Sequence, residues 1–146
     1  FEIIILGFAG VILAGALLLM LQKHRMPLFV NRDQISWDEL EEMCAEYPNL
    51  PIVLCCVSYD SDRHLYPLLK TFDNLYMDTS AYVVHNGISN ICKRFGAKRI
   101  LFGSGLPDYS ISASSAMIRY ADISDEEKRA IASENLLSLF KGVRFD

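Results

Sequence analysis

The side chains that could carry out chemistry lie near the ends of short apolar segments. Asp78 closes one such segment, where a carboxylate is costly unless it is paired or functional. His85 lies just beyond this segment end and could serve as an acid or base near neutral pH. We take Asp78 and His85 as the candidate catalytic residues, for proton transfer to or from a small polar substrate. The candidate substrate-binding residues are polar side chains near the same segment ends: Asn31, Ser58, Tyr82 and Ser104.

Each of these residues also has a structural interpretation. A hydrogen bond from neighbouring backbone would explain Asp78 as well as catalysis does. A histidine near the start of a helix, as His85 is expected to be, can cap that helix. The sequence therefore leaves both interpretations open.

The elements that position these residues recur at a constant interval. Strand-like segments start at Pro27, Pro51, Leu75 and Arg99, each 24 residues after the one before. Helical patterns follow them at 37–47, 63–72, 85–95 and 111–121. A parallel strand can be regained only through a crossover of a dozen or more residues, usually a helix. The interval therefore predicts an α/β fold of about four parallel strands alternating with helices.

Two helix starts carry a capping box, in which a Ser side chain and a Glu three residues later satisfy each other's backbone amides. Ser36 with Glu39 opens one helix, and Ser124 with Glu127 opens a closing helix that runs through Phe140.

An open doubly wound sheet shares the alternation of strands and helices with a barrel, although no glycine-rich phosphate loop follows a strand. In both architectures ligands bind at the carboxyl ends of the strands, so we expect the site there.

Composition excludes some partners and favours one compartment. The net charge of −4 and the lack of a Lys/Arg run argue against nucleic-acid binding, which needs a clustered basic face. The four cysteines show no C-x-x-C spacing and lie in apolar surroundings, which is typical of reduced, packed thiols. We therefore expect a cytoplasmic protein whose partner is a small-molecule substrate.

The N-terminal segment permits two interpretations. Residues 3–21 carry no charge and precede a basic group at 23–25, which meets the criteria for a membrane anchor. The same pattern is typical of a helix buried against a sheet, with its basic end complementing the helix dipole. We divide the chain into this helix, 1–25, and one β/α unit, 26–146. Because the first residue is Phe, we expect further sequence upstream.

Three segments in order carry a family resemblance. They are Leu-Tyr-Met-Asp-Thr-Ser at 75–80, Arg-Ile-Leu-Phe-Gly-Ser-Gly-Leu-Pro at 99–107 and Ser-Glu-Asn-Leu-Leu-Ser-Leu-Phe at 133–140. With them the chain resembles the C-terminal half of the amidohydrolase-related superfamily of metal-dependent hydrolases and decarboxylases. The resemblance extends back to about Gly15. It implies half of a (β/α)8, TIM-like barrel and an amidohydrolase-like activity.

The chain departs from that family where metal ligands are expected. Gly105 stands where the family's last strand presents a metal-binding Asp, and Asn31 and the Cys56–Val57 region stand where metal-binding His residues are usual. A hydrolytic zinc needs about three protein donors and an open position for water. We therefore assign no metal ligand, and a divalent metal such as zinc would require ligands from upstream sequence.

Three functions follow as hypotheses. The first is an amidohydrolase-like hydrolase with a degenerate metal site that acts on a small polar substrate. The second is a noncatalytic barrel that serves as a binding or assembly module, and the third is a membrane-tethered form of either, held by residues 3–21. Half a barrel leaves the strand at 28–31 as an open edge, so we expect a missing N-terminal half or a second copy to pair with it.

Overall fold

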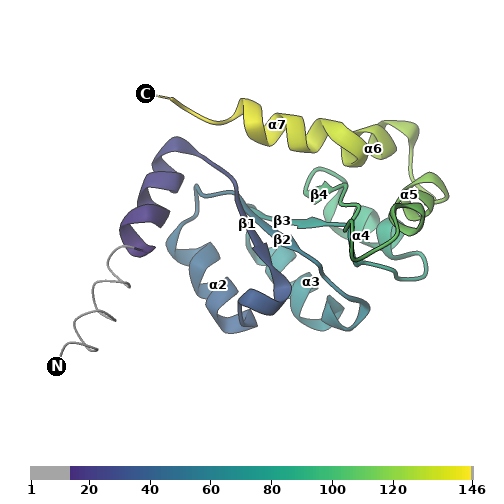
Figure 1. The fold of residues 1–146 in the computed structure, drawn as a ribbon, viewed down its shortest axis with the longest axis horizontal. Coiled ribbons are helices and arrows are strands. Elements are labelled where there is room, and N and C mark those ends of the chain that lie inside the picture. Colours follow the sequence, from purple (N-terminus) through teal and green to yellow (C-terminus); the bar gives the residue numbers. More distant parts are fainter. Residues whose placement is uncertain (1–13, 146) are drawn as a thin grey trace.

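The computed structural model describes residues 14–145. Its four strands form a single parallel sheet in the order β1-β2-β3-β4. The strands are β1 (Leu28–Asn31), β2 (Ile52–Cys55), β3 (Leu75–Asp78) and β4 (Ile100–Leu101). Each begins within one residue of the start predicted from the sequence interval, and helices separate the strands (Figure 1). The predicted α/β alternation of four parallel strands is therefore confirmed.

The helices follow the predicted pattern closely. A helix at residues 14–24 precedes β1. The capping box of Ser36 is formed, because its hydroxyl accepts from Glu39 N at 3.2 Å while the Glu39 carboxylate accepts from Ser36 N at 2.8 Å. The remaining helical elements are η1 (Arg32–Gln34), α2 (Trp37–Glu46), η2 (Tyr59–Ser61), α3 (Asp62–Thr71), α4 (Gly87–Phe95), α5 (Ile111–Arg119), α6 (Asp125–Arg129), the π-helical turn η3 (Ala130–Glu134) and α7 (Asn135–Lys141).

The two faces of the sheet are covered by different helices. Alternate strand residues such as Leu54, Met77 and Ile100 pack with α2, α3 and α4 into the main core. The other alternate residues, among them Val53 and Leu101, pack against α7. Figure 1 shows α7 on the opposite side of the sheet from α2 and α3. We call these the helix face and the α7 face of the sheet.

The two edges of the sheet differ in their backbone hydrogen bonding. On β4, Ile100 N donates to Ala97 O at 3.2 Å and Phe102 N donates to Ile131 O at 3.0 Å. The carbonyl of Ile100 accepts from Asn135 Nδ2 at 2.8 Å. These groups point away from β3, because Arg99 O and Leu101 O are the ones that accept from β3 amides. The outer edge of β4 is therefore closed by η3 and the start of α7.

The N-terminal prediction is tested only in part. Residues 3–13, the larger part of the segment considered as an anchor, lie outside the described residues. Across residues 14–145 there is no helix of the length and apolarity that a membrane span requires. Leu18 and Leu21 pack against the main core, whereas Leu17, Leu19 and Met20 are about half exposed. The choice between a buried helix and an anchor therefore stays a prediction.

Candidate functional site

The carboxyl ends of the strands bring the predicted residues to one edge of the sheet. Asn31 pairs in register with Cys55, and Asp78 pairs with Leu101. Because side chains alternate along a strand, Asn31, Cys55 and Asp78 all lie on the α7 face. Ser58 and Ser104 follow in the loops after β2 and β4. We call this edge, with its loops, the rim.

Asp78 is the most connected side chain of the rim. Its Oδ1 accepts from the backbone N–H of Cys56 at 3.1 Å and from that of Ser80 at 3.3 Å. The Ser80 hydroxyl donates to the same oxygen at 2.8 Å. These donors compensate the cost of placing a half-buried carboxylate at the end of an apolar strand. One oxygen of Asp78 thus joins the end of β2 to the turn after β3.

The second oxygen of Asp78 faces β4. A Cβ atom added to Gly103 would lie 2.5 Å from Asp78 Oδ2 and 2.9 Å from its Cγ, so only glycine leaves room for the carboxylate. Gly103 N also donates to the hydroxyl of Thr79 at 3.1 Å. The ends of β3 and β4 are therefore held in contact through a glycine, and the three hydrogen bonds that Asp78 accepts all end on Oδ1.

Two adjacent cysteines complete the cluster, with different environments. Burial, followed by the charge of Asp78, raises the pKa of the Cys55 thiol to about 12. Cys56 has φ of 57°, a left-handed conformation that is uncommon outside glycine, and its thiol lies 3.8 Å from the Ser80 hydroxyl. All four cysteines of the chain are free. Cys55 is therefore a protonated thiol at neutral pH.

The predicted polar residues of the outer rim make local contacts. Asn31 is exposed, and its backbone N–H donates to the Gln34 side chain at 3.1 Å. The Ser58 hydroxyl donates to Asp60, and this bond lowers the pKa of the Asp60 carboxyl. The Ser104 hydroxyl accepts from Leu106 N at 3.4 Å. All three side chains are at least partly exposed and can meet a ligand at the rim.

Two predicted residues lie away from this cluster. Tyr82 is fully buried in the main core, where its hydroxyl donates to Asp62 at 2.7 Å and burial raises its pKa. His85 is exposed and contacts Asn86 at 3.1 Å. It lines a hollow of about 390 Å³ between the start of α4 and α5. In this structure Tyr82 presents no surface to a ligand, and His85 lines a hollow that Asp78 does not line.

Sequence reasoning left out three groups that shape the Asp78 site. They are the Ser80 hydroxyl, the Cys56 amide and Gly103. A signal existed for Ser80, because an Asp followed two residues later by Ser is typical of a side chain that accepts local backbone and hydroxyl hydrogen bonds. Cys56 and Gly103 lie more than 20 residues from Asp78 in the sequence and come close only through strand pairing.

The donors of the rim do not fit a hydrolytic zinc. In the described part of the chain no cluster of three or more His, Cys, Asp or Glu side chains is arranged to hold a metal. Asp78 Oδ1 is already occupied by three hydrogen-bond donors. Gly105 has φ of 65°, and a Cβ there would lie 2.7 Å from the Tyr109 ring. This backbone therefore disfavours a ligand side chain at residue 105.

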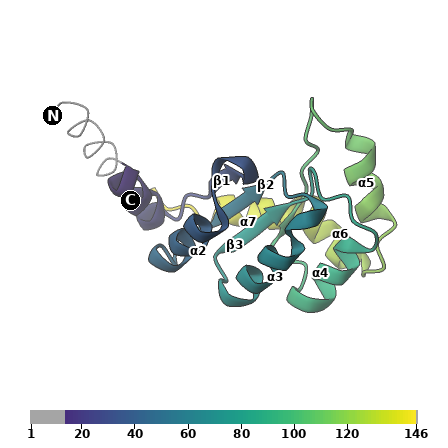
Figure 2. The ribbon, with the colours of Figure 1, turned by 90° about the horizontal axis from the view of Figure 1, so that it is seen from below.

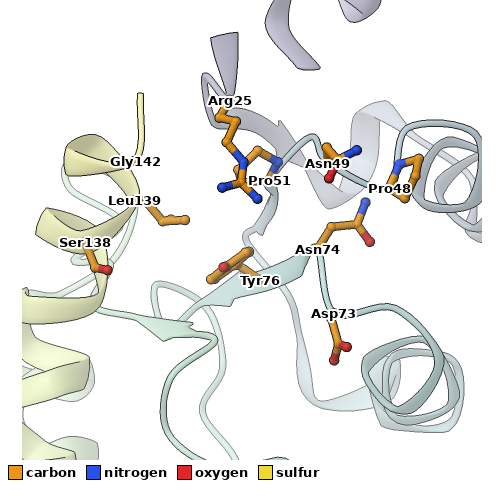
Figure 3. A pocket seen from close by; sticks show the side chains of 10 residues that line it. All are labelled: Arg25, Pro48, Asn49, Pro51, Asp73, Asn74, Tyr76, Ser138, Leu139 and Gly142. Carbon is orange, nitrogen blue, oxygen red and sulfur yellow. The ribbon is translucent and has the colours of Figure 1, made fainter. Parts of the chain in front are cut away.

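A second pocket lies at the opposite end of the sheet and has a structural explanation. It measures about 310 Å³ and lies between the starts of β2 and β3, the loop after residue 24 and α7. Figure 3 shows the guanidinium of Arg25 pointing toward the Tyr76 ring across this pocket. Asn74, on its wall, donates from Nδ2 to the carbonyls of Cys44, Tyr47 and Leu50 at 2.9–3.2 Å. The Asn74 side chain on the wall of this pocket therefore serves to hold loops together. We place the candidate site at the rim and not in this pocket.

Comparisons with known proteins agree on a family and a fold. A family model described as amidohydrolase matches residues 14–141. No curated protein matches the sequence. An uncharacterised TIM-barrel protein from Bordetella bronchiseptica is 14% identical with a TM-score of 0.74, and the match covers 88% of this chain and 50% of that one.

Two further solved structures have the same fold. A 2,6-dihydroxybenzoate decarboxylase in complex with 2,6-dihydroxybenzoate is 17% identical, with a TM-score of 0.64 and coverage of 83% of this chain and 52% of its own. Amidohydrolase 2 from Bifidobacterium longum subsp. infantis is 14% identical, with a TM-score of 0.57 and coverage of 81% and 49%. The chain thus spans about half the length of these structures, and identities this low show the fold alone. The predicted half of a TIM-like barrel is confirmed.

Proposed function

The chain belongs to the amidohydrolase family, and from this premise we propose that it carries half of the active-site rim of an amidohydrolase-like hydrolase. The substrate is a small polar molecule bound above the strand ends. Asp78 is the acid/base residue, and Asn31, Ser58 and Ser104 bind the substrate. The observation that supports this proposal most directly is that three hydrogen bonds to Oδ1 hold the Asp78 carboxylate in place and leave Oδ2 out of them.

The chemistry proposed for Asp78 is proton transfer during hydrolysis. Oδ2 accepts a proton from a water molecule while the oxygen of that water attacks the carbonyl carbon of the substrate. The same carboxyl then gives this proton to the leaving group when the bond to the carbonyl carbon breaks. A base that is fixed by its other oxygen needs little reorganisation between the two steps. We route no step through a metal, because residues 14–145 offer no cluster of side chains that could hold one.

The decisive variant is Asp78→Asn, which separates chemistry from structure. The amide oxygen of Asn can still accept the three hydrogen bonds at the Oδ1 position, so the fold is expected to persist. The amide group cannot accept a proton, so turnover is expected to fall by about 10²-fold or more. The matched control is Asp73→Asn, an exposed carboxylate at the opposite end of the sheet.

The assay is turnover of a panel of amides, esters and lactones, with the urea midpoint measured for each variant. Unchanged turnover in Asp78→Asn would exclude the acid/base role. His85 is tested in the same panel with His85→Gln. Because His85 lines a hollow that does not include Asp78, it becomes the second acid/base group only if this variant loses turnover while keeping its urea midpoint.

A second candidate function is a noncatalytic barrel that serves as a binding or assembly module. The saturated Oδ1 of Asp78 and the glycine at residue 105 favour it, because both leave the rim ordered without a metal ligand. On this alternative Asp78 is structural only. Elemental analysis and the substrate panel discriminate between the two functions, since any robust turnover counts against the second.

A further inference from the structure

Arg25 occupies a backbone position that normally favours glycine. It follows the helix at residues 14–24 with φ of 53°, in the left-handed region. Arg25 N donates to Gln22 O at 3.1 Å and Met26 N donates to Leu21 O at 2.9 Å, which is the Schellman pattern of helix termination. Glycine is usual at the left-handed residue of this pattern, because a Cβ atom is strained there. A role of the side chain would account for an arginine at this position.

The side chain of Arg25 lies over the pocket at the amino ends of β2 and β3. Figure 3 shows its guanidinium directed toward the ring of Tyr76 on β3, across a hollow of about 310 Å³. Within residues 14–145 this guanidinium takes part in no ion pair and no cation–π contact. Its charge is therefore not spent on another side chain of the described part of the chain.

The electrostatic field in the pocket is mainly positive. Burial raises the pKa of Tyr76, and the charges of Arg99 and Arg25 oppose this rise, so both guanidinium groups act on the Tyr76 hydroxyl. The one carboxylate among the lining residues is that of Asp73, which is fully exposed and lies 3.9 Å from Arg99. Such a field favours an anion over a cation in the pocket.

Apolar surface completes the lining. The Tyr76 ring, Pro48, Pro51 and Leu139 line the hollow, and Figure 3 shows the Leu139 side chain reaching toward it from α7. A cavity of about 150 Å³ already holds a benzene molecule, so this hollow has room for a ring and a charged head group. The pocket therefore combines one unpaired cation with walls that suit an apolar ligand body.

Two contacts between residue 24 and the segment after α7 hold opposite walls of the pocket together. Arg144 N donates to His24 O at 2.8 Å, and His24 Nδ1 lies 2.9 Å from Arg144 O. Figure 2 shows the segment after α7 reaching the helix at residues 14–24. Because Arg25 follows His24 directly, its wall is tied to the wall that Leu139 provides. The pocket is therefore formed before a ligand enters, which lowers the entropic cost of binding.

We propose that this pocket binds a small organic anion, with its carboxylate on the Arg25 guanidinium and its apolar body against the Tyr76 ring, Pro51 and Leu139. A guanidinium can hold a carboxylate through two parallel hydrogen bonds, which gives both energy and orientation. The pocket lies at the end of the sheet opposite the rim. The inference therefore concerns a second site and does not depend on the catalytic role of Asp78.

The test is titration of the ¹⁵N-labelled 146-residue chain with phenylacetate, followed by nuclear magnetic resonance. Phenylacetamide, which has the same shape without the charge, and inorganic phosphate, which has charge without an apolar body, are the control probes. We expect phenylacetate to shift the amide signals of Asn49, Asn74 and Gly142, which line the pocket, and both control probes to bind more weakly.

The decisive variant is Arg25→Gly, because it removes the charge and suits the left-handed backbone. Phenylacetate binding should weaken by about 10-fold or more, as expected for loss of charge-assisted hydrogen bonds. The urea midpoint should stay equal or rise, because glycine relieves the strain at this residue. The matched control is Arg63→Gln, an exposed arginine on α3 outside the pocket, which should leave binding unchanged.

Three results would overturn the proposal. One is the absence of signal shifts at Asn49, Asn74 and Gly142. Another is binding of phenylacetamide or phosphate as tight as that of phenylacetate. The third is an equal loss of affinity in Arg25→Gly and Arg63→Gln. If Arg25→Gly lowers the urea midpoint, Arg25→Gln decides, because it keeps the Cβ atom and the apolar stem and removes the charge, and unchanged binding in that variant would refute the proposal.

Discussion

Asn135 provides the sharpest test of how the sheet is held closed at β4. Its Nδ2 donates to Ala97 O and to Ile100 O, both at 2.8 Å, and the residue is only 9% exposed. Replacement by Ala removes both donors and leaves two carbonyls without these partners. A net loss of about 1–1.5 kcal/mol for each bond gives an expected destabilisation of about 2–3 kcal/mol for Asn135→Ala.

The assay is urea unfolding followed by far-ultraviolet circular dichroism at low protein concentration. With a slope of about 2 kcal/mol per molar urea, the midpoint should fall by about 1–1.5 M and the slope should stay constant. The matched control is Asn90→Ala, an exposed asparagine on α4 whose change should cost less than about 0.5 kcal/mol. If Asn135→Ala loses no more stability than this control, the two bonds do not hold β4 and the reasoning fails.

The other predictions concern glycines and thiols. Gly103→Ala should lower the free energy of unfolding in urea by about 1–3 kcal/mol, because the added Cβ would meet Asp78. The helical control Gly15→Ala, with nothing within 4 Å of its added Cβ, should not lower it. Equal effects of the two variants would refute the close approach of Gly103 to Asp78. Gly105→Asp should lose about 1–2 kcal/mol and gain no zinc by elemental analysis, because residue 105 has φ of 65°; bound zinc would contradict the fit argued for the rim. Burial raises three thiol pKa values above the ordinary 9.0: those of Cys44 and Cys55 to about 12 and that of Cys92 to about 11. The free energy of unfolding in reductant should therefore fall as pH rises above about 9, by up to about 2 kcal/mol at one pH unit higher after allowance for solvent screening. A free energy of unfolding that does not change with pH in this range would refute the reasoning.

The sequence predicted the parts of the fold that depend on local pattern. Strand starts, helices and the Ser36 capping box follow from apolar spacing and short-range hydrogen bonds, and all are formed as expected. The environment of Tyr82 could not be predicted in this way. Its position just after a strand indicated the rim, but its hydroxyl pairs with Asp62 on α3 and its ring is buried in the core. Whether Tyr82 lies at the rim or in the core depends on how α3 packs against it, which the local sequence does not show.

The closed edge of β4 could not be predicted for a similar reason. Asn135 bonds to residues 35 and 38 positions earlier, through a side chain that is polar but buried. Nothing in the local pattern of the closing helix distinguishes this Asn from a solvent-exposed one. The sequence therefore indicated an open edge at β1 and gave no sign that the other edge is satisfied within the chain.

The hydrogen bonds of Asp78 explain how the rim can stay ordered without a metal. A metal bound by several strand ends would hold them together by coordination. Its loss would leave carboxylates at an apolar edge, where they would repel one another and be poorly hydrated. Here one carboxylate oxygen accepts from β2 and from the turn after β3, and Gly103 lets β4 approach the other oxygen. A cation bound through Oδ1 would have to displace the two backbone amides and the hydroxyl that donate to this oxygen. The same contacts that fix the strand ends therefore occupy Oδ1 and leave Oδ2 outside this set of hydrogen bonds.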